Sequence, residues 1–473
     1  MKRERVLLTG ASGSMGFAAF EALWPRRDRF DIVLLLRPSA KNVAMFRPFL
    51  DGRAVDGPGT HHYHDGSLTI VWGDAQRDED VRAACRGIDA LLNPMAFIAP
   101  AADLDPDTAE AVNVGAVESL IRAVKAEPDG AERIRFVHVG SVAQYGDRLP
   151  PRHMIRTGDP MQPSVFDFYA TTKIRGERAV VESGLRRWVS LRQTFITIPE
   201  FMTELMDPIF FHLPINTAIE MNTKYDAGRG LVNALDVEPG SDFWGRVYNM
   251  AGGPSCRFAS LDYVREMFAI AGAADWRDMF ERRWFARRNF HCGWFADSQV
   301  LEGYLHFWQD DLAAHFGQVR EYMTRLAAEM EAAGTPLPTG AEAIRAVMEQ
   351  MVDAPTGTRF WREQGFEGRM NAFFGGTAAW DATPGWDAPL PPMPADVEPL
   401  LLDHGYDEGK AVLERRDLEE AARFRGGQLV AGDWNGDWRA PLHWEDAAGR
   451  RFEASANLVL KAGHWSPFEA APP

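Results

Sequence analysis

The chain has few cysteines: Cys85, Cys256 and Cys292, three in 473 residues. Their wide spacing excludes a disulfide framework and offers no paired metal ligands. The chain also has no apolar run long enough to span a bilayer. The short run after Lys2 and Arg3 is too brief for a signal peptide. We therefore expect a cytoplasmic protein with no membrane partner.

Basic residues are outnumbered, with 51 Lys and Arg against 67 Asp and Glu and a net charge of -16. Nucleic acids and anionic membranes attract positive charge, so this balance argues against both as partners. Apolar residues make up 46% of the chain, which is enough for a large core. The length is typical of two or three domains.

A glycine-rich segment follows the first apolar run. Val6-Leu7-Leu8 is typical of a strand and residues 17–24 of a helix. A glycine turn between the two places backbone N–H groups at a helix N-terminus, where they can hold a pyrophosphate. The turn predicts a dinucleotide site formed by Thr9, Gly10, Ser12, Gly13, Ser14, Met15 and Gly16.

Apolar runs then alternate with helix-like runs as far as about Val189. Strands are predicted at 33–36, 68–72, 90–92 and 135–139, and helices at 80–85 and 108–125. Continuous apolar runs are typical of strands that are buried on both faces. The alternation therefore predicts an α/β protein with a Rossmann-type, doubly wound parallel sheet.

The pattern loosens after residue 192. An apolar segment with several prolines at 195–225 is typical either of a ligand cover or of ordinary core. Residues 258–330 look largely helical, and 375–397 form a Pro/Gly-rich linker. We predict a dinucleotide-binding core at 1–195, a smaller substrate-binding lobe with part of the core sheet at 196–335, a helical segment and linker at 336–397, and a small C-terminal α+β module at 398–473.

Two further motifs carry chemistry. Tyr169 and Lys173 are four residues apart and would share one face of a helix. A phenol titrates near ~10 and a nearby ammonium favours the phenolate, so we expect Lys173 to lower the pKa of Tyr169. Ser141 follows the predicted strand at 135–139, at the edge where open sheets bind ligands. Its hydroxyl would hold a substrate oxygen near Tyr169.

Together these motifs resemble the extended short-chain dehydrogenase/reductase family, which includes NAD(P)-dependent epimerases and dehydratases. The matching residues are T-G-x-x-G-x-x-G at 9–16, Gly73-Asp74, Asn113-Val114-Gly115, Ser141 with Tyr145-Gly146, and Tyr169 with Lys173. The resemblance implies that Tyr169 is the acid/base, that Lys173 tunes its pKa and binds ribose, and that Ser141 polarises the substrate. It also implies an adenine contact at Asp74, a cofactor contact at Ala96, and a supporting or proton-relay role for Asn113 among the catalytic residues. Family members often form homodimers, here through helices at 104–125 and 169–184.

The end of the second strand distinguishes two cofactors. NAD enzymes carry an acidic residue there, whereas this chain has Arg37, with Lys41 close behind. Basic groups suit a 2′-phosphate, so we expect NADP(H), with NAD(H) as the alternative. We predict an NADP(H)-dependent oxidoreductase that interconverts a carbonyl and a secondary alcohol on a hydrophobic or aromatic small molecule.

Two other functions stay open. An NAD-dependent sugar-nucleotide epimerase needs cations for a diphosphate, and the candidates are Arg229, Arg287 and Arg288. Sugar dehydration is disfavoured, because Val142 and not an acid follows Ser141. A non-catalytic, dinucleotide-sensing regulator is the alternative of another class. The candidates for polar substrate contacts are His212, Asn216 and His291.

Two segments resemble metal sites, but we expect no metal at either. His61-His62-Tyr63-His64 lies in a Gly/Asp-rich segment that is predicted to be a solvated turn. Residues 444–452 and 463–469 resemble a small zinc-binding module, but Asp446, Ser466 and Glu469 stand where such modules carry cysteines. We expect packing there by Trp434, Trp438, Trp444 and Trp465 instead.

Overall fold

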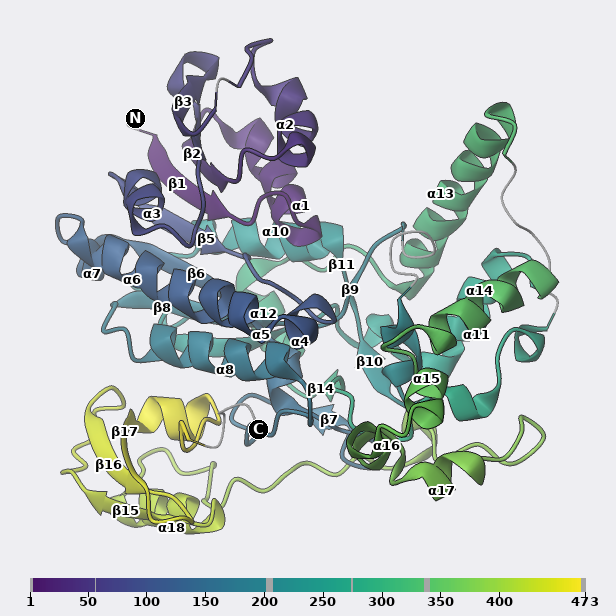
Figure 1. Cartoon of the computed structure of the whole chain (residues 1–473). Coiled ribbons are helices and arrows are strands. Elements are labelled where there is room, and N and C mark those ends of the chain that lie inside the picture. Colours follow the sequence, from purple (N-terminus) through teal and green to yellow (C-terminus); the bar gives the residue numbers. More distant parts are fainter. Residues whose placement is uncertain (1–2, 56, 201–206, 274, 336–340, 469–473) are drawn as a thin grey trace.

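The structure is a computed structural model that describes residues 3–55, 57–200, 207–273, 275–335 and 341–468. Its centre is an eight-stranded sheet of order β12-β8-β6-β5-β1-β2-β4-β3 (Figure 1). All neighbouring strands are parallel except β3 and β4. The strands are β1 (Glu4–Thr9), β2 (Phe30–Leu36), β3 (Gly59–Tyr63), β4 (Leu68–Trp72), β5 (Ala90–Asn93), β6 (Arg135–Ser141), β8 (Arg187–Gln193) and β12 (Arg246–Met250). The predicted Rossmann-type parallel sheet is confirmed.

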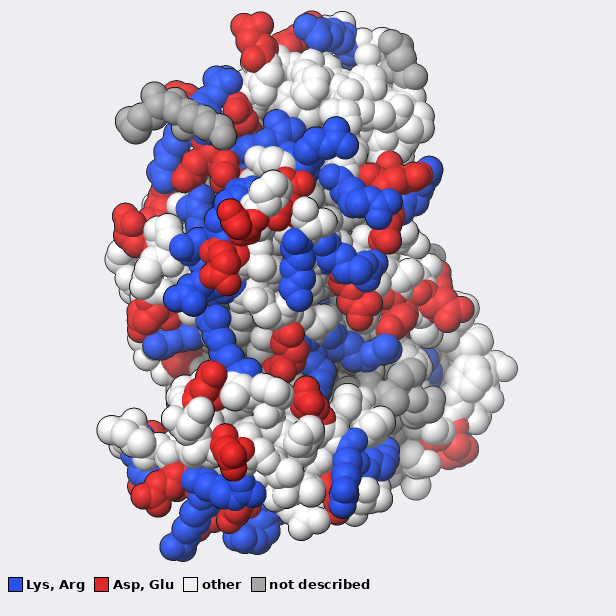
Figure 2. Space-filling view, turned by 90° about the vertical axis from the view of Figure 1, so that its left-hand side faces the viewer, with Lys and Arg blue, Asp and Glu red and all other residues white. Residues whose placement is uncertain are grey.

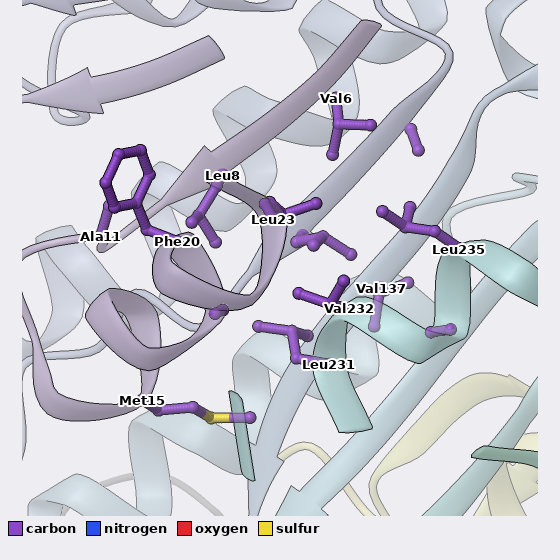
Figure 3. Packing of buried hydrophobic residues seen from close by; sticks show 14 of the residues in the cluster. Val6, Leu8, Ala11, Met15, Phe20, Leu23, Val137, Leu231, Val232 and Leu235 are labelled. Carbon is purple, nitrogen blue, oxygen red and sulfur yellow. The ribbon is translucent and has the colours of Figure 1, made fainter. Parts of the chain in front are cut away.

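Helices cover both faces of this sheet. On one face, α1 (Ser14–Leu23) packs against α10 (Lys224–Asn233), and Figure 3 shows their side chains beside those of β1. On the other face lie α3 (Asp78–Cys85), α6 (Ala116–Ala126) and α8 (Phe168–Val181). Five more helices flank the sheet: α2 (Ala40–Phe46), α4 (Ala101–Leu104), α5 (Pro106–Glu110), α7 (Gly130–Arg133) and α12 (Ser298–Leu305). Because neighbouring strands are parallel, their carboxyl ends meet at one edge of the sheet. The segment that follows β8 packs against this edge.

The histidine segment differs from its prediction. His61 and His62 lie in the edge strand β3, not in a solvated turn. His62 Nδ1 lies 3.0 Å from Thr69 Oγ1, whereas His64 Nδ1 pairs with Asp51 at 2.8 Å. The strand was missed because its polar and glycine residues give no apolar pattern; Tyr63 alone in it is buried.

The lobe follows β8 and is only partly helical. Its helices are α11 (Ser260–Ile270) and α13 (Leu312–Ala332), and its short strands are β9 (Ile196–Thr197), β10 (Ala218–Glu220), β11 (Asn222–Thr223), β13 (Arg257–Ala259) and β14 (Trp294–Phe295), which pairs with β7 (Met154–Ile155). The prediction of a largely helical 258–330 is wrong for 271–273 and 275–297, which form turns, two single-turn 3-10 helices (Trp276–Asp278 and Arg282–Trp284) and β14. Asn289 and Cys292 have φ values of 71° and 149°, outside the helical region. Residues 201–206 of the predicted apolar segment at 195–225, among them Phe201, Met202 and Met206, lie outside the described residues.

The segment that was predicted as a helical piece and linker packs against the lobe. It contains α14 (Ala341–Asp353), α15 (Thr358–Glu363), α16 (Glu367–Phe374) and α17 (Thr377–Asp381). Met348, Trp361 and Phe373 are buried in one cluster with Phe211 and Phe280 of the lobe. This segment therefore enlarges the lobe before the chain returns to the core sheet.

The C-terminal module, residues 398–468, holds α18 (Arg415–Phe424) and an antiparallel sheet of β15 (Gln428–Ala431), β16 (Pro441–Glu445) and β17 (Arg451–Ser455). The predicted α+β module is confirmed. Trp444 and Trp465 pack edge to face at 5.7 Å, as do Trp434 and Trp438 at 5.5 Å. Asp446 accepts hydrogen bonds from Ser466 and Arg450, and Glu469 lies outside the described residues.

The surface is charged and mixed in sign. Figure 2 shows basic and acidic side chains interspersed over the side of the molecule that lies on the left in Figure 1. Among the helices that the structure describes, none is long and apolar enough to cross a membrane. Within the same residues, no group of three His, Cys, Asp or Glu side chains is arranged to hold a metal ion.

Candidate active site

A cavity of about 520 Å³ begins at the glycine turn and continues into the lobe. Its sheet side is formed where β1, β5, β6 and β8 end, as expected for ligands of an open parallel sheet. The predicted residues that line it are Gly10, Gly13, Ser14, Met15, Gly16, Ala96, Ser141, Tyr169 and Lys173. One space thus joins the predicted phosphate turn to the predicted catalytic side chains.

The glycine turn leaves no room for side chains. Gly10 has a φ of +59°, and a Cβ there would lie 2.8 Å from the Cα of Met95. A Cβ on Gly16 would lie 2.1 Å from the carbonyl oxygen of Gly10. Gly13 is the residue before α1, and it is exposed toward the cavity. Backbone N–H groups at a helix N-terminus can therefore meet a diphosphate closely, and the turn suits a dinucleotide.

Other predicted cofactor residues lie outside the cavity lining. Thr9 donates to Asn93 Oδ1 at 2.6 Å and so ties β1 to β5. Ser12 lies in the glycine turn. Asp74 lies beside the end of β2, because Gly73 N donates to Leu36 O at 2.9 Å. The two exposed basic residues after β2 are Arg37 and Lys41.

Ser141, Tyr169 and Lys173 converge as predicted from two elements, β6 and α8. The Ser141 hydroxyl lies near enough to the Tyr169 phenol to lower the pKa of that phenol. Asp167 caps α8 by accepting from Ala170 N at 2.8 Å. Lys173 is buried, and its Nζ donates to Val139 O at 2.6 Å, two residues before Ser141. The helix face carries both Tyr169 and Lys173 to the end of β6.

The predicted pKa of Tyr169 is wrong in direction. Burial raises the pKa of Tyr169 to about 12, Ser141 lowers it, and Asp167 raises it further. Burial lowers the pKa of Lys173 to about 8, and Glu177 opposes this shift. The prediction failed because it weighed the ammonium against the phenolate and left out the cost of removing each charge from water. At neutral pH the phenol keeps its proton.

Asn113 supports the site from behind and does not line the cavity. It is buried in a single wide turn at 111–115, between α5 and α6. Its amide donates to Phe97 O at 2.8 Å and to Thr172 Oγ1 at 3.0 Å, and its oxygen accepts from Phe97 N at 2.8 Å. These contacts match the supporting role of the two that the resemblance implies, because Asn113 joins α8 to the loop after β5; the proton-relay role stays a prediction.

Acidic residues near the start of α8 were missed from the sequence. Asp103 accepts from Tyr169 N at 3.2 Å, and Asp167 accepts from or donates to His291 Nδ1 at 2.8 Å, according to their protonation. Burial first, and then Asp167, raise the pKa of Asp103 to about 6. His291 lines the cavity, so one of the three predicted polar contacts is placed there. An aspartate just before Phe168 was a visible N-cap signal, but its partner lies 124 residues away.

The part of the cavity that lies in the lobe is apolar. Among the described residues that line the whole cavity there is no Arg, Asp or Glu, and Lys173 is the one Lys. Arg229 bonds Asp226 and Phe307 O, and Arg288 bonds Asn371 O and Ala372 O. None of the three candidate arginines lines the cavity, nor do His212 and Asn216, which bond Thr356 O and Pro392 O. The lobe side is formed mainly by Ile196, Ile198, Phe210, Leu213, Ile215, Phe258, Leu261, Val264, Met267, Phe268 and Phe285.

A parallel sheet with Ser141, Tyr169 and Lys173 around one cavity is the arrangement that the predicted resemblance to extended short-chain dehydrogenases/reductases implies. Residues 6–192 match the model of the NAD dependent epimerase/dehydratase family. The match covers less than half of the chain, and over these residues it confirms the predicted resemblance. No curated protein sequence matches the chain.

Solved structures share the fold at low sequence identity. A dTDP-glucose 4,6-dehydratase from Bacillus anthracis str. Ames, in complex with NAD, is 14% identical with a TM-score of 0.52. That match covers 68% of this chain and 97% of that chain. A double mutant of DesIV, a dTDP-glucose 4,6-dehydratase from Streptomyces venezuelae with NAD and DAU bound, is 18% identical with a TM-score of 0.51. It covers 69% of this chain and 99% of that one.

Replacing Asn113 by Ala is expected to lower the free energy of unfolding by about 2–4 kcal/mol. The substitution leaves the N–H and C=O of Phe97 without their buried partner. Urea unfolding followed by tryptophan fluorescence measures the loss. Thr172→Val is the control, because it removes one of the three Asn113 hydrogen bonds and the bond from Thr172 Oγ1 to Tyr169 O but keeps both Phe97 groups paired, so it should cost less. Equal stability of N113A and wild type would contradict the supporting role.

Proposed function

We propose that the protein is an NADP(H)-dependent oxidoreductase that interconverts a carbonyl and a secondary alcohol on a neutral, hydrophobic small molecule. The observation that carries this proposal is the single cavity that runs from the glycine turn, past Ser141 and Tyr169, into an apolar lobe. Hydrogen-bonding groups lie where a carbonyl would react, and apolar side chains surround the remaining space.

The protein's own groups perform the proton chemistry. A nicotinamide dinucleotide, when bound on the glycine turn, supplies or accepts the hydride. In the reductive direction, Ser141 donates a hydrogen bond to the carbonyl oxygen and Tyr169 gives that oxygen its proton. Tyr169 is suited to this because burial keeps its phenol protonated at neutral pH. The ammonium of Lys173, from the same helix face, favours the phenolate that is left.

The substrate is proposed to be uncharged. A sugar nucleotide carries a diphosphate, and burying that charge without cations is costly. The described lining offers only Lys173, which already donates to Val139 O. His291 is the proposed polar contact beside the reacting group, because its ring is held by Asp167 at 2.8 Å.

Replacing Tyr169 by Phe is expected to reduce turnover by at least about 100-fold, because the proton donor is removed. NADPH oxidation with a panel of hydrophobic aldehydes and ketones measures the turnover, and fluorescence titration measures NADPH binding. Tyr263→Phe is the matched control: Tyr263 lines the same cavity, but its hydroxyl bonds His315 at 2.9 Å. Unchanged turnover in Y169F would refute the assignment.

We propose that Arg37, with Lys41, selects NADP(H) over NAD(H). Both are exposed just after β2, on the side of the glycine turn where a ribose 2′-phosphate would lie. Arg37→Ala should raise the KM for NADPH roughly tenfold and leave the KM for NADH unchanged. Arg47→Ala, an exposed residue after α2, makes the same change in net charge elsewhere and should alter neither. A better KM for NADH in the wild-type protein would overturn the preference.

An NAD-dependent sugar-nucleotide epimerase is the alternative that the family description favours. Such an enzyme restores its cofactor in each turnover and gives no net redox change. Net consumption of NADPH with a simple carbonyl supports the oxidoreductase, whereas tightly bound NAD and no net redox support the epimerase. A dinucleotide-sensing regulator would bind the cofactor and turn over neither substrate.

We also propose a homodimer that forms through α6 and α8. The exposed side chains of these helices include Glu118, Arg122, Lys125 and Arg175, so the interface would be polar. Light scattering should therefore give about twice 52.9 kDa at low salt and a lower mass at high salt. A mass of one chain at low salt would contradict this proposal.

A further inference from the structure

The C-terminal module is docked against α8, the helix that carries Tyr169 and Lys173 (Figure 1). Arg178 donates to Trp465 O at 2.9 Å and to Glu453 O at 3.2 Å. Ser455 Oγ donates to Glu182 Oε1 at 2.6 Å. The module therefore holds α8 through several contacts near its C-terminal end.

The module also holds the segment that leads into α8. His404 Nε2 lies 2.8 Å from Asp159 Oδ1, and both side chains are buried. Met161 N donates to Gly463 O at 3.1 Å. A Cβ on Gly463 would lie 2.1 Å from Asp159 O, so the two backbones are in close contact.

A buried charge pair lies between α8, β8 and the module. Glu177 and Arg192 are fully buried and pair at 2.6 Å. Arg192 also donates to Ala462 O of the module at 2.5 Å and to the Tyr145 hydroxyl at 2.6 Å. His464 of the module is 2.8 Å from Glu177 Oε1. Burial is the largest influence on the pKa of His464 and lowers it. The ring is therefore neutral, and its N–H donates to the Glu177 carboxylate.

This pair lies directly behind the catalytic residues. Glu177 follows Lys173 by four residues on the same helix face, and its charge opposes the lowering of the Lys173 pKa. A Cβ on Gly140 would lie 2.9 Å from Glu177 Oε2 and 3.2 Å from Arg192 Cγ. Gly140 stands between Val139, which accepts from Lys173, and Ser141. A shift of Glu177 would therefore displace both Lys173 and the end of β6 at Ser141.

We propose that the module is part of the catalytic unit and that His464 is a positioning residue, which acts through Glu177 on Lys173 and on the end of β6. Removing a donor from a buried carboxylate costs more than removing an exposed contact, because no water replaces it. The effect should fall more on the chemical step than on cofactor binding, because Lys173 is expected to make one ribose contact, whereas the diphosphate would be held by the glycine turn between β1 and α1. The kinetic part of this inference rests on the proposed function.

The test compares three full-length variants with the wild-type chain. His464→Gln keeps an N–H donor toward Glu177, whereas His464→Leu has a similar volume and no donor. His443→Leu is the control, because His443 lies exposed on β16 of the same module. H464L is expected to lower kcat at least about tenfold with the KM for NADPH within about twofold, which matches the loss of a hydrogen bond to a charged group. H464Q should retain kcat within about threefold, and H443L should match wild type.

Hydrogen exchange separates this inference from the proposed function. Amides of residues 168–181 should exchange faster in H464L than in wild type and H464Q, whether or not a substrate is found. Wild-type kcat and exchange in H464L, or equal losses in H464Q and H464L, would overturn the positioning role. If H464L does not fold, His464→Asn replaces it, since its shorter amide does not reach Glu177. Wild-type exchange and kcat in H464N would overturn the proposal in the same way.

Discussion

The ion pair between Glu177 and Arg192 is the interaction on which the arrangement of the catalytic side depends. Two charges without solvent contact are tolerated only when their remaining donors and acceptors are satisfied. Here the partners come from β8, from the turn after β6 and from the C-terminal module: Ser190, Tyr145, Ala462 and His464. Because these groups surround one helix face, α8 has one orientation in which all the hydrogen bonds of the ion pair are made. That orientation fixes the positions of Tyr169 and Lys173, which lie on the same helix.

Much of the sheet was predictable, because strands buried on both faces are continuously apolar and a glycine turn marks the first crossover. Five strand positions were predicted, each within three residues of its bounds in the structure. Of the other three, β8 and β12 were not assigned, and β3 was missed because an edge strand needs no apolar run; its His62 bonds Thr69 of β4. The irregular segment 275–297 was missed for a related reason: its buried aromatic residues pack on segments that are distant in the sequence, such as 341–380.

The residues that form the site were predictable from the sequence, but their pKa values were not. Helical spacing places Tyr169 and Lys173 on one face, and strand ends converge by topology. The pKa values depend on how deeply each group is buried, and the spacing of residues along the chain does not reveal that burial. The predicted lowering of the Tyr169 pKa was therefore wrong. Glu177 was a visible signal, since an acid four residues after Lys173 on a buried helix face requires a partner. That the partner includes a histidine 287 residues away follows only from the fold.

The apolar lining and the protonated phenol both reflect the burial of the site. Where fewer water molecules compete for a carbonyl oxygen, each remaining polar contact to it is stronger. The same burial favours the neutral phenol, so the resting site presents a proton donor and a hydroxyl to an otherwise apolar ligand. A charged substrate would lose its hydration there without compensation. Substrate polarity and the protonation state of Tyr169 are thus coupled properties of one cavity, and a substitution that admits water should change both together.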